Sequence, residues 1–179
     1  GRRADLYEFA DVALSKRVTH GFHALSIDEQ RVDFTPTLWE ARESVTQVLF
    51  PGAHADVGGG YPPEETGLSN GALRWMVSRL AQIGLRFDCP DWPTVDPKGL
   101  LHRQLAGTAH VSLRTFPAGL ELSATCAARL AAPAAPVTNE VAGAPPIWEP
   151  YRPANLLEHY LTPEMSGVRA GVVVADINC

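Results

Sequence analysis

The sequence has no long apolar run, no basic cluster and no closely spaced cysteines, and each absence removes a class of protein. None of its apolar runs approaches the roughly 20 residues that a membrane-spanning helix needs. Lys and Arg number 15 against 20 Asp and Glu, which gives a net charge of −5. Nucleic-acid binding proteins normally carry a basic face instead. The sequence therefore predicts neither a transmembrane segment nor a nucleic-acid partner.

The three cysteines, Cys89, Cys126 and Cys179, lie far apart. None has the Cys-x-x-Cys spacing of a zinc or redox site, and an odd number argues against a disulfide framework. The first residues also lack the charged and apolar regions of a signal peptide. These features favour reduced structural thiols. They leave cytoplasmic residence and secretion without a cleavable signal both open.

What is present is typical of one globular domain: 179 residues, 45% hydrophobic and 20% charged. Val45 to Phe50 is apolar and stops at Pro51-Gly52, which predicts a buried strand. A helix capped by Ser69 or Asn70 and ended by Gly84 follows. The order of strand, glycine-rich loop and helix is typical of α/β proteins, which place active groups beyond the carboxyl ends of strands.

From about residue 100 onward the patterns weaken. Leu122 to Leu130 is compatible with one short helix. The segments 131–136 and 143–146 are rich in Pro and Ala or Gly, and we interpret them as connectors that cannot be helical. The sequence predicts α/β structure over residues 1–110 and an irregular peripheral extension over 111–179.

His54 is the leading candidate for chemistry, because it lies just beyond a strand end and imidazole exchanges protons near neutral pH. The alternative is a structural histidine bonded to loop backbone. Asp56 either orients a histidine or accepts backbone N–H groups, and its two-residue spacing from His54 favours the backbone. Gly58, Gly59 and Gly60 permit positive φ and a close approach of the loop backbone to a ligand or another segment.

A metal site is a second hypothesis. His20 and His23 lie three residues apart, near Asp28 and Glu29 and upstream of His54, a set of types that binds zinc or iron. Their spacing matches no specific metal motif. The remaining histidines, His102, His110 and His159, stand alone and are interpreted as structural or exposed.

A serine nucleophile is the missing part. An α/β-hydrolase needs Gly-x-Ser-x-Gly at a strand-to-helix elbow, and the sequence contains no such pentapeptide. Ser69, which lies between Gly67 and Gly71, is the serine whose neighbours come nearest to that pattern. It does not follow an apolar strand and it comes after His54, so helix capping explains it better.

Several stretches resemble the DUF2235 family, the α/β-hydrolase-like catalytic domain of Tle1-type phospholipase effectors of type VI secretion. They are His23–Arg31, Phe34–Trp39 and Val48–Tyr61, with the helix Ala72–Leu85 and, more loosely, Tyr151–Leu156. The resemblance covers roughly residues 6 to 90 well, and its central motif is long and unusual.

The resemblance implies a Ser-acid-His hydrolase of lipid or other esters, without a cofactor. Val45 to Phe50 then corresponds to the last core strand and His54 to the triad histidine. The family's nucleophile, in a motif like Gly-Phe-Ser-Arg-Gly, and its acid, in one like Asp-Thr-Val, both precede the matching region and are absent here. The chain thus resembles the carboxyl-terminal portion of such a domain, with the amino-terminal portion of the same or a separate chain as its partner.

Three hypotheses follow. The chain supplies the general base of a larger serine hydrolase, or it is a non-catalytic remnant or binding module, or it is a small metal-dependent enzyme. The roles of Asp28 and Glu29 also stay open, between a structural salt-bridge network with Arg31 and the lining of the cleft.

Overall fold

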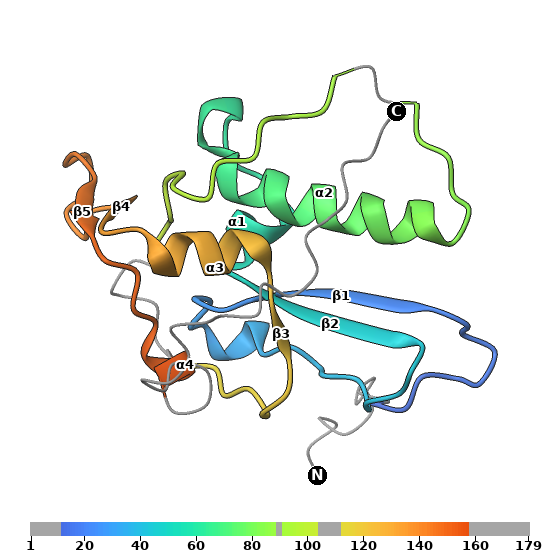
Figure 1. Ribbon diagram of the computed structural model, residues 1–179. Helices are drawn as coiled ribbons and strands as arrows, with labels where there is room; N and C mark the ends of the chain where they lie inside the picture. Colours follow the sequence, from blue (N-terminus) through green and yellow to red (C-terminus); the bar gives the residue numbers. More distant parts are fainter. Residues whose placement is uncertain (1–11, 89–90, 104–111, 158–179) are drawn as a thin grey trace, which may run out of the picture.

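The computed structural model describes residues 12–88, 91–103 and 112–157 (Figure 1). They form a mixed α/β fold around a small parallel sheet. In chain order the elements are β1 (Gly21–Ser26), the 3-10 helix η2 (Val32–Phe34), β2 (Val45–Phe50), α1 (His54–Gly58), the 3-10 helix η3 (Pro63–Glu65), α2 (Gly67–Gln82), β3 (Glu121–Leu122), α3 (Ala124–Ala131), β4 (Ala135–Val137), β5 (Ile147–Glu149) and α4 (Ala154–Leu157).

The sheet has the order β1-β2-β3, and both pairs are parallel. The strand predicted at Val45 to Phe50 is confirmed as β2. The expectation that it is the last core strand is wrong, because the two-residue β3 pairs with it on the side away from β1. So short a strand carries no period-2 pattern that a sequence could reveal. Among the described residues no strand pairs with the outer edge of β1.

Alternation along β2 places its side chains in two apolar clusters, one on each face of the sheet. Val48 and Phe50 pack with Ala72 and Trp75 of α2. Leu49 joins the larger cluster, which also contains Leu25 of β1 and residues of α3, β4 and α4. Both faces are therefore covered, as is usual for parallel sheets.

Helix α2 is confirmed, but its start differs from the prediction. It begins at Gly67 with Thr66 at the capping position, so Ser69 and Asn70 lie inside the first turn. The Ser69 hydroxyl donates to the Thr66 carbonyl, which explains why a capping residue type is tolerated there. Gly84 ends the helix as predicted, with φ of 97°. Leu85 N–H donates to the Leu80 carbonyl and Gly84 N–H to that of Ala81, which is a Schellman motif.

The expectation of an irregular extension after residue 110 is wrong for the part that the structure describes. Helix α3 matches the predicted short helix, and its cap Ser123 accepts from Cys126 N–H. Strands β4 and β5 form an antiparallel pair that includes Pro136. Strand β4 also bridges to Leu101, whose N–H donates to the Pro136 carbonyl at 3.1 Å, and so short a ribbon tolerates a residue that cannot donate. The predicted boundary near residue 110 lies outside the described residues.

Cys126 is a free, fully buried thiol, and burial raises its pKa. Its place in the larger apolar cluster confirms the structural interpretation. Cys89 and Cys179 lie outside the described residues. Across the described ranges, no helix has the length and apolar character to cross a membrane.

Candidate active site

The register of β1 and β2 brings the candidate site together. Gly21 pairs with Val45 and Ser26 with Phe50, a constant offset of 24 residues. The two segments stay side by side past the strand ends, because Ile27 N–H donates to the Phe50 carbonyl and Asp28 N–H to the Gly52 carbonyl, both at 3.0 Å. The next residue, Glu29, therefore arrives beside the first turn of α1.

The segment after β2 is helical rather than the predicted loop. Helix α1 begins at His54 itself and ends at Gly58. Asp56, at the third position of α1, accepts from Ala53 N–H at 2.9 Å and so satisfies a free donor of the helix start. Gly58 belongs to the helix, whereas Gly59 and Gly60 have φ of 86° and 130°. The prediction of positive φ is thus confirmed for the last two glycines.

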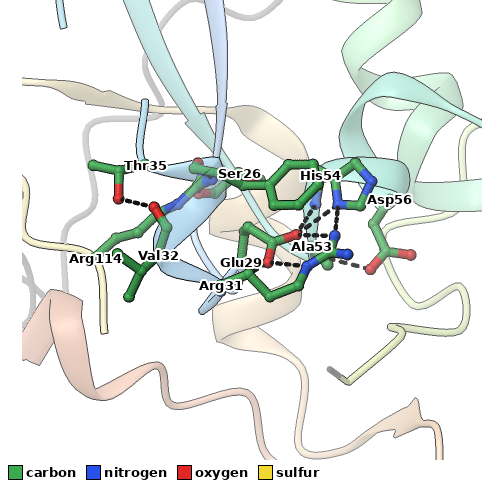
Figure 2. Close-up of polar contacts among 10 residues, drawn as sticks. Ser26, Glu29, Arg31, Val32, Thr35, Ala53, His54, Asp56 and Arg114 are labelled. Atoms are coloured by element: carbon green, nitrogen blue, oxygen red, sulfur yellow. Dashed lines mark hydrogen bonds and ion pairs between the residues drawn. The ribbon is translucent and has the colours of Figure 1, made fainter. Parts of the chain in front are cut away.

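His54 is held through one ring nitrogen by a buried carboxylate. Its Nδ1 lies 2.6 Å from Glu29 Oε2, and the Glu29 side chain has no exposed surface (Figure 2). Because a carboxylate only accepts, Nδ1 carries the proton and the Nε2 lone pair is left for other partners. The imidazole is 46% exposed and stacks on Phe34 with a centroid distance of 5.0 Å. A half-exposed ring with a free Nε2 is suited to take a proton from a substrate or nucleophile.

Arg31 keeps the Glu29 carboxyl ionised. Its Nε and Nη2 each donate to a Glu29 oxygen at 3.0 Å, and its backbone N–H donates at 2.9 Å. Burial by itself raises the Glu29 pKa, but the bonds from Arg31 and His54 outweigh it and lower the pKa to about 2. Arg31 Nη2 also lies 2.8 Å from His54 Nδ1. His54 Nδ1 and Arg31 Nη2 do not bond to each other, because both are donors. Both donate to the same oxygen, Glu29 Oε2.

Asp56 does not orient His54. Two residues of an α-helix are separated by about 200° around its axis, so the two side chains leave α1 on opposite sides. Figure 2 shows the Asp56 carboxylate turned toward Ala53 and away from the His54 ring. Its histidine partner is His102, whose Nδ1 lies 2.7 Å from Asp56 Oδ1. Asp56 accepts from the backbone N–H groups of Ala53 and His102 rather than from the glycine turn, and the histidine that it contacts is His102 and not His54.

The structure does not assemble the hypothesised metal site. Within residues 12–88, 91–103 and 112–157, no group of three or more His, Cys, Asp and Glu side chains is placed to hold a metal ion. His20 is exposed and stacks on Phe22. His23 Nδ1 donates to Gln47 Oε1 at 3.3 Å, and its ring lies against Trp39. His110 and His159 fall outside the described residues.

Asp28 and Glu29 are neighbours with different tasks. Asp28 Oδ2 accepts from Gly52 N–H at 2.6 Å and from the Tyr151 hydroxyl at 2.7 Å, which ties the strand end to the chain near residue 150. Burial raises the Asp28 pKa to about 6 despite these bonds. Glu29 pairs with Arg31, which is one of the two roles left open by the sequence. It also holds His54, a role that the sequence did not assign to it.

Two adjoining cavities open next to His54. The first, of about 200 Å³, is lined by His54, Gly58, Ser26 at the end of β1, and Arg114. Arg114 Nη1 donates to the Ser26 carbonyl and hydroxyl at 2.7 and 2.6 Å. The second, of about 360 Å³, shares Ala24, Val57 and Gly58 with the first and extends along α2. No local pattern in the sequence marks Arg114, because it reaches Ser26 from 88 residues away.

Comparison with known protein families identifies a segment that contains the candidate site. Residues 2–79 match the family described as "T6SS, Phospholipase effector Tle1-like, catalytic domain". The match contains His54, Glu29 and Arg31, and it confirms the family resemblance seen in the sequence. The remaining described elements, from the end of α2 to α4, lie beyond the matched residues of the Tle1-like segment.

The chain is also similar to a Saccharomyces cerevisiae protein described as uncharacterized, with 40% identity over 60 residues. The alignment covers 32% of this chain and 8% of the yeast protein. The chain therefore spans only a small part of that relative's length. No solved structure matches the chain.

Gly52 is a residue whose replacement should disturb the packing of the candidate site. A Cβ at this position would lie 2.3 Å from Asp56 Cβ and 2.7 Å from Asp56 Oδ2, and φ is +101°. We expect Gly52→Ala to lower the free energy of unfolding by about 3 kcal/mol, from backbone strain and overpacking together. Urea unfolding measures this change.

Gly84→Ala is the matched control, because Gly84 has φ of +97° and a Cβ there would meet no atom within 4 Å. It should show only the conformational cost, about 1 kcal/mol. Equal destabilisation by the two variants would contradict the close packing of Asp56 against Gly52.

Proposed function

We propose that this chain supplies the general base and its orienting acid to a serine-dependent ester hydrolase of the phospholipase type. His54 is the base, and Glu29, rather than the upstream aspartate that the resemblance implies, is the acid. The observation that carries the proposal is the 2.6 Å contact between His54 Nδ1 and a fully buried Glu29 carboxylate, inside the segment that matches the Tle1-like catalytic domain.

In the proposed reaction, His54 Nε2 accepts the proton of a serine hydroxyl as its oxygen attacks the ester carbonyl. The imidazolium that forms keeps its Nδ1–H bond to Glu29, whose negative charge stabilises it. Nε2 then returns the proton to the leaving alkoxide, which departs as an alcohol. Water, deprotonated by the same nitrogen, hydrolyses the acyl-enzyme and restores the serine. Arg31 keeps Glu29 ionised throughout.

We further propose that the serine is delivered at the outer edge of β1 by sequence beyond the 179 residues, in the same polypeptide or another. That edge has no partner strand among the described residues. Parallel strands place their carboxyl ends at one edge of the sheet, where active groups of α/β proteins gather. A strand added beside β1 would therefore end near Ser26 and the cavity that His54 lines.

Labelling with a fluorophosphonate tests this proposal, because such probes react covalently with activated serines. The native full-length protein should be labelled on one serine in a Gly-x-Ser-x-Gly segment, and His54→Ala should abolish labelling. Peptide mass mapping identifies the serine. His20→Ala, which removes an exposed histidine outside the site, should leave labelling unchanged.

Two outcomes would overturn the proposal. A native protein that is never labelled and hydrolyses no ester favours the alternative of a non-catalytic remnant or binding module. Labelling that survives His54→Ala shows that another group activates the serine.

A further inference from the structure

A second histidine and two carboxylates lie on the opposite side of α1 from His54. His102 Nδ1 is 2.7 Å from Asp56 Oδ1, and His102 Nε2 is 3.1 Å from Glu65 Oε2. The backbone N–H of His102 also donates to Asp56 Oδ2, at 3.1 Å. Tyr61 stacks on the His102 ring with a centroid distance of 3.5 Å. We call the three charged side chains the Asp56–His102–Glu65 bridge.

The bridge requires a charged imidazole. Both ring nitrogens face carboxylate oxygens, so both must donate, and only imidazolium has two N–H groups. Burial opposes this charge, but the bonds and charges of Asp56 and Glu65 outweigh it and raise the His102 pKa. The Asp56 side chain is fully buried, that of His102 is 12% exposed and that of Glu65 is 36% exposed.

The bridge acts on the helix that carries His54. Asp56 binds Ala53 N–H at the start of α1 with the same oxygen that accepts from His102 N–H. Tyr61 and Glu65 follow the glycine turn that ends α1. A five-residue helix has too few internal bonds to fix its own orientation. Two polar contacts on opposite sides, Glu29 with His54 and His102 with Asp56, therefore act on its rotation together with its packing against α2 and β1.

We propose that His102 is a positioning residue for His54: through Asp56 it fixes the rotation of α1, and Glu65 keeps it in the doubly donating form. This inference rests on the proposed function only in naming His54 as the base. It adds pH control to that function. When His102 loses one of its two ring protons, it also loses one of its hydrogen bonds to Asp56 and Glu65.

The sign of the pH effect follows from the raised pKa. A group whose pKa is higher in the folded chain stabilises the fold fully below its unfolded value, 6.5, and this contribution is lost as the pH rises through the folded value. The groups that face His102 among the described residues are Asp56 of α1, Glu65 of η3 and Tyr61 of the intervening turn. Tyr61 is neutral in this range, since burial raises its pKa above 10.

NMR of ¹⁵N-labelled histidine in the full chain tests the proposal. We expect His102 to titrate above 6.5, and the His54 Nδ1 proton, bonded to Glu29, to give a downfield resonance that broadens as His102 deprotonates. In Glu65→Gln the His102 pKa should fall toward 6.5, and the His54 resonance should broaden at correspondingly lower pH. Glu64→Gln, an exposed neighbour in the same 3-10 helix, makes the same charge change and should shift neither.

His102→Gln should abolish the His54 resonance in a chain whose other amide signals persist. In the active hydrolase it should lower kcat by roughly 10²-fold with KM unchanged, as a small misplacement of a base does. If His102→Gln fails to fold, the exposed Glu65→Gln carries the test. An unchanged His54 resonance in a folded His102→Gln chain, or an unshifted His102 in Glu65→Gln, overturns the inference. Because the resonances need no hydrolysis, an inactive chain with the expected coupling refutes the proposed function alone.

Discussion

His54→Ala is expected to lower kcat/KM of the proposed serine hydrolase on the order of 10⁶-fold, the scale seen when a triad member is removed. Without Nε2, no group is left to take the serine proton or to protonate the leaving alkoxide. His54 has partial exposure and packs mainly on Phe34, so the fold should survive. Hydrolysis of a soluble chromogenic ester, with thermal unfolding measured in parallel, checks both expectations.

His20→Ala serves as the control for the loss of an imidazole. His20 is exposed and hydrogen-bonds no group of the site, so its removal should change kcat/KM by less than about twofold. A His54→Ala protein that retains a tenth of its activity would show that His54 is not the base.

Glu29→Gln is expected to lower kcat by about 10⁴-fold, as when the triad acid becomes an amide. The amide keeps the shape of the side chain, but it no longer stabilises the imidazolium. An amide nitrogen facing His54 would also favour the tautomer with its proton on Nε2. The variant should lose about 2 kcal/mol of stability, because Arg31 loses charge-assisted bonds.

The pH dependence of Glu29→Gln gives an independent check. The folded pKa of Glu29, about 2, is below the ordinary 4.5, so its stabilising contribution is present above pH 4.5 and is lost as the pH falls toward 2. The free energy of unfolding, measured between pH 4.5 and 2, should therefore fall more steeply with decreasing pH in wild type than in Glu29→Gln. Glu40→Gln, at an exposed glutamate, should behave as wild type. If the free energy of unfolding of Glu29→Gln and of wild type fell equally with decreasing pH, the depressed pKa of Glu29 would be contradicted.

The sequence predicts those parts of the fold whose signals are local. The apolar run of β2 and the Gly84 stop of α2 each lie within a few residues of the element that they define. The strands β3, β4 and β5 escape prediction because two or three residues carry no periodicity, and Pro136 argues against a strand. Their pairing is decided by tertiary contact.

The site divides in the same way. His54 is recognisable because it directly follows a strand, and a strand end is a local feature. Glu29 carries no mark of its own, since its task depends on a partner 25 positions later. His102 is 46 positions from Asp56 and Arg114 is 88 from Ser26. The register of β1 on β2 brings Glu29 to His54, whereas the contacts of His102 and Arg114 depend on the packing of later segments of the chain.

The constant offset between β1 and β2 has a consequence for insertions and deletions. The distance from Glu29 to His54 is set by the strand pairing and not by the length of the connection between the strands. Added residues near 40–44 would lengthen a surface segment and leave the two side chains facing each other. Removal of one residue inside β1 would move Glu29 by about 3.3 Å and point it to the other face of the sheet. The tolerance of the chain to length changes thus differs sharply between two segments that lie only some 15 to 20 residues apart.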